Sequence, residues 1–514
     1  MKYFLTLIQL WVGFLSICAS YPKANIWIIP SVESPQVYRN YAQTSKVHLE
    51  MARGEVEHIQ LVFPSKVNEE YRFTFDRYLK GIQISARELK KMNGYYDALV
   101  PFKNQLKCTD TLTAVWITVQ CPSRVPVGKY HQTIKIEGSK HFTIQLDYNV
   151  HHTTIPLKSS IPITVGVENR CMTECLNDKE ADKERQRWVD FVLSYRMTPV
   201  FGTQITPERW QYEHSFSPWA WNDKRSIRLL NDRRYSCYML PFFTLSENEL
   251  ASLLCNIQKK GKLKESLFYI WDEPAYMEDY EQIKRKVNII RKYASDARIL
   301  TTFFCGPRNG PRKGDLYAVF DYLKHHIHVA TISLAPCKGN EEEVQHIRYK
   351  VPEGIDWWSY VCWQPGGNEP NFLLQMKGIQ QRAIMWRTWK NGSQGFLYWN
   401  CNIYHKRNPF TYITDIPHGD GILIYPGDIL GCKGPIASAR LERWRDGAEE
   451  MELLRLVEKN YSKEKADTLL NIVYSSPLSF IEKAHNIPFF RKELLDQLDK
   501  TIPIDYKLRI TDFI

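Results

Sequence analysis

The stretch Ile161-Pro-Ile-Thr-Val-Gly-Val167 marks the point at which the chain begins to alternate between strands and helices. Its β-branched residues are typical of a buried strand. An amphipathic segment follows at Lys183–Tyr195, and a second strand-like segment comes at Thr198–Phe201. Further strand-like segments recur along the chain: Tyr238–Phe243, Leu267–Trp271, Arg298–Phe304, Val329–Leu334, Asp356–Cys362 and Gly395–Asn400.

This alternation predicts a (β/α)8 TIM-type barrel spanning residues 158–458, because about eight strand–helix units are needed to close one. A doubly wound open sheet is the competing fold, but no Gly-rich phosphate loop follows the first strand. A long amphipathic helix, Ala437–Val457, ends the barrel.

The segments on either side of the predicted barrel have different secondary-structure patterns. Residues 21–157 contain β-branched and aromatic strands separated by turns such as Pro126-Val-Gly128, which predicts an antiparallel β-sandwich. Residues 459–514 are expected to form a C-terminal helical extension that packs on the barrel.

The first 20 residues have the layout of a secretory signal peptide. Met1-Lys2 is a short positive region, Phe4–Ile17 is apolar, and Cys18-Ala-Ser20 is a small-residue cleavage site. The apolar run is too short for a membrane span, which needs about 20 residues. We expect an exported protein, secreted, periplasmic or on the cell surface. Two alternative interpretations of this segment are a lipid anchor at Cys18 and a buried N-terminal helix.

Composition limits the classes of partner and cofactor. The 514 residues carry a net charge of +11, but basic residues are interspersed with acids and no run of five or six occurs. This pattern is typical of a solvated mixed surface, so no nucleic-acid partner is expected.

The cysteines and histidines suggest neither a disulfide framework nor a metal centre. Of 12 Cys, Cys108–Cys121 could bridge neighbouring strands and Cys171–Cys175 a loop, with the rest read as buried small hydrophobes. No C-x-x-C pair occurs, and His325-His326-Ile-His328 is read as a solvated helix end rather than a ligand set. We expect no metal and no cofactor.

The segment Leu267-Phe-Tyr-Ile-Trp-Asp-Glu-Pro274 carries the strongest chemical signal. An apolar strand runs directly into two carboxylates, Asp272 and Glu273, and a proline then stops it. Active residues of barrels sit at the C-terminal ends of strands, where two neighbouring acids can supply one proton donor and one charged group. The pair is either catalytic or a loop that caps the next helix.

Other strand ends are aromatic or polar, as expected of a sugar site, where rings stack on C–H faces and amides bond hydroxyls. For any single tryptophan, core packing is the competing reading. No G-x-S-x-G, H-E-x-x-H or P-loop motif occurs, which argues against the commonest esterases, zinc hydrolases and ATPases. The candidate substrate-binding residues are Trp271, Tyr360, Trp363, Tyr398, Trp399 and Asn400.

Several motifs occur in the order found in a known family: Arg53–Gln60, Pro126–Tyr130, Asp272-Glu273-Pro274, Gly392–Trp399, Gly419–Gly427 and Ser438–Glu450. On these motifs the chain resembles the glycoside hydrolase family 123 group, also called DUF4091 proteins, along nearly its whole mature length.

The resemblance implies a β-N-acetylgalactosaminidase that uses substrate-assisted catalysis. Glu273 would be the general acid and base, and Asp272 would orient the substrate acetamido group and stabilise an oxazolinium-like intermediate. No protein nucleophile is then required. Two alternatives stay open: another glycosidase on the same scaffold, and a non-catalytic surface glycan-binding protein.

Overall fold

The computed structural model describes residues 26–76, 81–206, 211–304, 316–336, 348–349, 351–404, 408–409 and 418–500. The predicted signal peptide, with Cys18, lies outside the described residues. Within the described residues, no helix has the length and apolar character that crossing a membrane requires.

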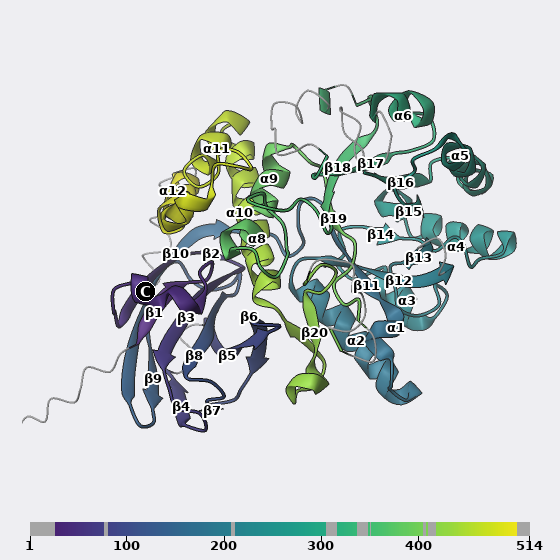
Figure 1. Cartoon of the computed structure of the whole chain (residues 1–514). Coiled ribbons are helices and arrows are strands. Elements are labelled where there is room, and N and C mark those ends of the chain that lie inside the picture. Colours follow the sequence, from purple (N-terminus) through teal and green to yellow (C-terminus); the bar gives the residue numbers. More distant parts are fainter. Residues whose placement is uncertain are drawn as a thin grey trace, which may run out of the picture.

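The N-terminal part forms two five-stranded sheets packed face to face (Figure 1). Their pairs are antiparallel, as predicted, except that β2 and β10 run parallel. Apolar side chains such as Leu61, Ile117 and Ile144 fill the space between the sheets. In spatial order the first sheet is β1 (Trp27–Pro30), β3 (Glu55–Pro64), β8 (Leu112–Cys121), β5 (Gln83–Met92) and β6 (Tyr95–Pro101), and the second is β2 (Lys46–Arg53), β10 (His141–Thr154), β9 (Gly128–Glu137), β4 (Glu70–Phe75) and β7 (Gln105–Lys107).

The following part contains one nine-stranded sheet that curls until its two edges meet. All hydrogen-bonded neighbours are parallel except β12 and β13. The last strand in each direction, β13 and β14, lie against each other, and β13 also contacts β15. The spatial order is β13 (Gln211–Ser215), β12 (Thr198–Thr206), β11 (Ile163–Glu168), β19 (Phe396–Tyr398), β18 (Asp356–Val361), β17 (Val329–Ser333), β16 (Arg298–Phe303), β15 (Ser266–Trp271) and β14 (Tyr238–Met239).

This sheet differs from the predicted (β/α)8 barrel at one place. The strand β13 folds back on β12 as an antiparallel hairpin. It therefore occupies the edge of β12 on which the next parallel strand would pair. The sheet is mixed and nearly closed, and β14 keeps only two residues.

Helices follow most of the parallel strands and cover the outside of the sheet (Figure 1). The helix that begins at Glu247 starts with a capping box formed by Ser246 and Glu249. The segment Gly378–Lys390 forms two short helices separated at Ala383. These helices are α1 (Asn169–Thr173), α2 (Asp178–Ser194), α3 (Lys224–Leu229), α4 (Glu247–Lys259), α5 (Met277–Arg291), α6 (Leu316–Leu323), α8 (Gly378–Arg382) and α9 (Ile384–Lys390).

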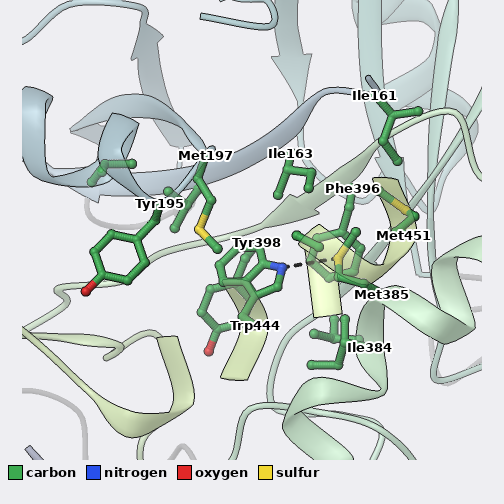
Figure 2. Close-up of a cluster of buried hydrophobic side chains, with 14 of the residues drawn as sticks. Ile161, Ile163, Tyr195, Met197, Ile384, Met385, Phe396, Tyr398, Trp444 and Met451 are labelled. Atoms are coloured by element: carbon green, nitrogen blue, oxygen red, sulfur yellow. Dashed lines mark hydrogen bonds between the residues drawn. The ribbon is translucent and has the colours of Figure 1, made fainter. Parts of the chain in front are cut away.

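The helix α10 (Ala439–Asn460) lies between the N-terminal sheets and the nine-stranded sheet (Figure 1). Two further helices, α11 (Lys463–Leu470) and α12 (Ile487–Asp499), pack against it, and a small hairpin of β20 (Ile424–Pro426) and β21 (Pro435–Ala437) precedes it. Figure 2 shows Trp444 of α10 at the centre of a buried cluster with Phe396, Tyr398 and Met385. Its indole nitrogen lies 3.2 Å from the Met385 sulfur.

The charged residues of α10 are buried in ion pairs that join these parts. The Nε2 atom of His58, on β3, lies 3.1 Å from Oε2 of Glu442 and 3.2 Å from Oδ1 of Asp446. Arg382 of α8 pairs with Asp446 at 3.0 Å and with Glu450 at 2.6 Å. Removing one member of such a buried pair leaves an uncompensated charge. The Ser438–Glu450 motif therefore contributes much of the contact between the N-terminal sheets, the nine-stranded sheet and the C-terminal helices.

Neither of the two disulfides that the cysteine positions allowed is formed. All nine cysteines among the described residues are unpaired, including Cys108, Cys121, Cys171 and Cys175. Cys171 is buried on the inner side of α1, whereas Cys175 is exposed beyond the end of that helix. Cys108 and Cys121 are each buried as single thiols, in line with their reading as small hydrophobes.

Candidate active site

The residues around the acid pair face the interior of the nine-stranded sheet. Alternate residues of a strand point to opposite sides. Leu267 and Tyr269 of β15 belong with Trp358 and Tyr360 of β18 to the inner apolar cluster, whereas Phe268 packs in the outer one. The inner residues at the carboxyl ends of the parallel strands are called the rim below: Glu168, Tyr269, Asp272, Glu273, Thr302, Tyr360 and Trp399.

Glu273 sits in an unusual backbone conformation immediately after β15. Its φ is 45°, in the left-handed region that residues with a side chain seldom adopt. The conformation is held by Thr302 of β16, whose Oγ1 accepts a hydrogen bond of 2.9 Å from the Glu273 amide. Strained backbone of this kind is found mainly where it positions a functional group.

Asp272 is fixed as a hydrogen-bond acceptor. Its Oδ1 receives the Thr302 hydroxyl at 2.6 Å and the Tyr269 hydroxyl at 2.7 Å. One threonine thus holds the side chain of Asp272 and the backbone of Glu273 together. The two acids reach the same side of the rim because the chain turns between them.

Tyr360 connects the opposite strand β18 to the acid pair. Its hydroxyl donates a hydrogen bond of 2.5 Å to Oε1 of Glu273. Burial, with a further contribution from Glu273, raises the pKa of Tyr360 well above its usual value. The phenol therefore stays protonated and acts as a donor. The arrangement orients one oxygen of Glu273, as a general acid requires.

His214 of β13 continues this wall of the rim. Its ring stacks on Tyr269 with centroids 4.3 Å apart and an angle of 22° between the planes. Burial lowers the pKa of His214 to about 4, so the imidazole is neutral at physiological pH. The neutral ring fixes Tyr269 without adding charge beside Asp272.

Trp399 follows β19, and its orientation depends on a buried acid. The indole Nε1 donates to Oδ1 of Asp420 at 2.9 Å, and the Tyr398 hydroxyl donates to the same oxygen at 3.1 Å. Burial raises the pKa of Asp420 to about 6, despite the opposing effect of these two donors. Trp399 is half-buried, packs against both the inner and the outer cluster, and is positioned by this contact.

Trp363 is the most exposed of the predicted aromatic residues. Its side chain is 44% exposed, just beyond the end of β18. The ring stacks on Phe304, which follows β16, with centroids 6.2 Å apart and planes inclined by 16°. This pair extends the rim outward with a flat apolar surface of the kind that sugar rings use.

Three predicted binding residues lie elsewhere. Trp271 packs against the outer cluster with Lys286 of α5 5.1 Å from its ring centre, because the register of β15 shifts between Tyr269 and Trp271. Tyr398 lies in the outer cluster of Figure 2 beside Trp444. Asn400 accepts a hydrogen bond from the Asn402 amide and supports the loop.

The predicted site residues do not include Glu168, His214, Tyr269, Thr302 and Asp420. Tyr269 stands two positions before the end of β15 and Thr302 one position before the end of β16, and period-two alternation places both on the inner face. Glu168 ends the first strand of the nine-stranded sheet, which is a recognisable signal. For Asp420 only its place in the Gly419–Gly427 motif was available.

No group of three or more His, Cys, Asp or Glu side chains suited to a metal ion occurs among the described residues. The imidazole of His328 accepts a hydrogen bond from the Ile299 amide at 3.2 Å. The rim offers carboxylates, hydroxyls and aromatic rings, which suit an acid-catalysed reaction on a hydroxylated substrate.

Comparisons with known proteins identify the family and the fold. The model of the glycoside hydrolase 123 catalytic domain matches residues 183–457, more than half of the chain. No curated protein matches the sequence. A family 123 glycoside hydrolase from Clostridium perfringens, described in connection with glycolipid glycan hydrolysis, has the same fold. The TM-score is 0.62 at 13% identity, covering 95% of this chain and 100% of that chain. A Bacteroides ovatus GH5 xyloglucanase reaches only 0.26, at 10% identity over 79% and 98% of the two chains, and this likeness carries no argument.

Proposed function

The chain belongs to glycoside hydrolase family 123, and on that premise we propose that it removes terminal β-linked N-acetylhexosamine, most readily N-acetylgalactosamine, with retention of configuration. The observation that supports this proposal is the acid pair at the end of β15. Asp272 is held as an acceptor by Tyr269 and Thr302, while Glu273 receives the Tyr360 hydroxyl. The two acids thus have different surroundings and can take different roles.

In the first step Glu273 gives its proton to the glycosidic oxygen, and the bond from that oxygen to the anomeric carbon breaks. The carbonyl oxygen of the substrate's acetamido group attacks the same carbon from the opposite face. Asp272 accepts a hydrogen bond from the acetamido N–H and balances the positive charge of the oxazolinium ion that forms. The leaving alcohol carries away the proton of Glu273.

In the second step Glu273, now a carboxylate, takes a proton from water. The resulting hydroxide equivalent attacks the anomeric carbon, and the bond to the acetamido oxygen breaks. Two inversions give net retention. No protein nucleophile is needed, which fits an arrangement in which Asp272 is already committed to two hydroxyl donors.

A panel of aryl glycosides tests the substrate. We expect turnover of aryl β-N-acetylgalactosaminide, slower turnover of the N-acetylglucosaminide, and none of the β-galactoside, which lacks the acetamido group. Replacing the acetyl group by mono-, di- and trifluoroacetyl should lower kcat progressively, because fluorine makes the attacking carbonyl oxygen less nucleophilic. Equal rates along this series, or turnover of the plain galactoside, would indicate a different glycosidase mechanism on the same scaffold.

The (β/α)8 barrel remains our interpretation of the nine-stranded sheet, with β13 as an insertion. We divide the chain into a sandwich (21–157), a catalytic barrel (158–458) and a helical extension (459–514). Export with cleavage after Ser20 is proposed on the sequence of residues 1–20 alone. N-terminal sequencing of the mature protein tests it, and a mature chain that begins with an acylated Cys18 would instead show a lipid anchor.

A further inference from the structure

A third carboxyl group lies on the rim, at the end of β11. The strand alternates, with Val165 and Val167 in the outer apolar cluster, so Glu168 points to the inner side. Its neighbour in register on β12 is Gly202, two residues after Val200, which belongs to the inner cluster. Glu168 lies upstream of the segment matched by the family model.

The carboxyl group of Glu168 is buried and only half satisfied. The residue as a whole is only 4% exposed. Oε1 accepts a hydrogen bond of 3.2 Å from the Arg170 amide, whereas Oε2 has no hydrogen-bond partner among the described residues. Burial raises the pKa of Glu168 to about 7, against the opposing influence of Arg170. A buried carboxyl oxygen without a donor is costly, and a water, an ion or a ligand hydroxyl would remove this cost.

The backbone of Glu168 is fixed, so the side chain is held in place. The Glu168 amide donates to Oδ1 of Asn402 at 2.8 Å, and its carbonyl accepts from Nδ2 of the same residue at 3.1 Å. The adjoining strand β19 approaches closely, because Gly166 has no side chain to meet the Trp399 carbonyl. Glu168 therefore stands next to the strand end that carries Trp399.

The space between Gly202 and the unpartnered oxygen is large enough for a methyl group. A Cβ built on Gly202 would lie 4.0 Å from Oε2 of Glu168 and 3.5 Å from Cδ1 of Tyr212, both ordinary contacts. Beyond Gly202 in the same register row stands His214, which stacks on Tyr269, the donor to Asp272. Glu168 and the acid pair are thus connected through Gly202, His214 and Tyr269, which line one side of the sheet interior.

We propose that Glu168 accepts hydrogen bonds from the hydroxyl groups at C4 and C6 of the bound sugar and thereby sets which epimer is hydrolysed. The inference rests on the proposed function, which places the anomeric carbon at Glu273. C4 lies opposite C1 in a pyranose ring, so its substituents point away from the scissile bond. Hydroxyl groups are the donors that the unpartnered Oε2 lacks, and the strand end that carries Trp399 lies next to β11.

The test combines an enzyme variant with substrate analogues. Glu168→Gln is compared with wild type on aryl β-N-acetylgalactosaminide, its C4 epimer, and the 4-deoxy and 6-deoxy compounds. Measured at pH 8, where Glu168 is a carboxylate, kcat/KM for the parent substrate should fall by about 10- to 100-fold, the usual effect of losing a hydrogen bond to a charged group. The loss should nearly vanish on at least one deoxy compound, because the missing hydroxyl leaves nothing for Glu168 to bind.

Two further variants separate binding from folding. Glu184→Gln changes a buried glutamate of α2, bonded to Trp188 outside the rim, and should leave all four rates unchanged. Gly202→Ala adds a methyl group that the fold accommodates but that occupies the space before Oε2. We expect an unchanged melting temperature and a raised KM.

An equal loss on the parent and both deoxy substrates, or no loss on the parent, would overturn the proposal. If wild type hydrolyses none of the four compounds, the proposed function fails, and calorimetric binding of free N-acetylgalactosamine then tests Glu168 alone. Weaker binding by Glu168→Gln supports the assignment. Equal affinity, or no binding by wild type, contradicts it.

Discussion

The hydroxyl of Tyr360 lies 2.5 Å from Oε1 of Glu273, although the two residues are 87 positions apart in the chain. They come from β18 and from the turn after β15, two strands that are separated in the sheet by β16 and β17. The contact therefore crosses the interior of the nine-stranded sheet. It makes the orientation of the proposed acid depend on the closure of the whole sheet.

Tyr360→Phe removes this hydroxyl and keeps the buried ring. We expect kcat to fall by about 10- to 100-fold, since a hydrogen bond to a charged group is worth about 1.5–3 kcal/mol. Steady-state kinetics on an aryl N-acetylhexosaminide measure the effect. Tyr235→Phe is the control, because its buried hydroxyl bonds the Phe216 carbonyl away from the rim. An unchanged kcat in Tyr360→Phe would show that this hydrogen bond does not contribute to catalysis.

Thr302→Val keeps the shape of the side chain and removes the hydroxyl that joins the two acids. The Glu273 amide loses its acceptor and Asp272 loses a donor, so we expect a stability loss of about 1–3 kcal/mol and a lower kcat. Thr302→Ser should restore both. Thr301→Val is the matched control: its hydroxyl is buried without a partner among the described residues, so this variant should be neutral or more stable. Denaturant unfolding and kinetics report the two effects, and equal behaviour of the two valine variants would refute the assignment.

Asp420→Asn tests the buried acid that positions Trp399. Burial raises the pKa of Asp420 to about 6, so the native state holds the proton more tightly than the unfolded chain. The free energy of unfolding therefore falls as pH rises from about 4 to about 6, by about 3 kcal/mol from this group. The asparagine variant lacks that decline and should gain stability over wild type across this window.

Urea unfolding at several pH values measures the difference. Asp321→Asn, whose side chain is 83% exposed, is the control and should show no such trend. A constant difference between Asp420→Asn and wild type from pH 4 to 7 would contradict the account of Asp420.

His58→Leu tests the ion pairs around α10. Burial alone would lower the pKa of His58, but the carboxylates of Asp446 and Glu442 raise it above its usual value. The stabilisation is complete below about pH 6.5 and is lost as pH rises through the folded-state pKa. At pH 6 the free energy of unfolding of the variant should be lower than that of wild type by about 3–5 kcal/mol, because two buried carboxylates lose the His58 imidazolium as a partner. His131→Leu, at an exposed pair with Asp147, should change little.

The kcat of the folded fraction of His58→Leu should match wild type, because His58 lies outside the rim. Thermal melts at pH 6 and 9, together with kinetics below the melting temperature, give both quantities. A kcat loss without a stability loss would show that this cluster acts in catalysis instead.

The sequence carried the strand–helix alternation and the acid pair, because both depend on neighbours along the chain. Period-two alternation also identifies the antiparallel sheets, which the structure confirms apart from the parallel β2–β10 pair. The antiparallel hairpin β12–β13 was not predicted.

The binding residues were harder to predict because they depend on which way a strand end turns. Trp271 and Tyr269 are two residues apart and equally suited to a sugar, yet the register shift in β15 sends Trp271 to the outer side. The Ser438–Glu450 motif pointed to the family, but its side chains form the buried pairs of α10 instead of the rim. Only the folded chain shows that distinction.

The central claim is that Glu273 is the acid of an N-acetylhexosaminidase, and one comparison tests it most directly. The comparison measures kcat/KM of wild type and of Glu273→Gln on two aryl β-N-acetylgalactosaminides. One substrate has a poor leaving group and the other has a good one. General acid catalysis contributes about 10²- to 10⁴-fold. We predict a loss of that size with the poor leaving group and a much smaller loss with the good one, which needs little protonation. Equal activity of Glu273→Gln and wild type on the poor leaving group would contradict the account.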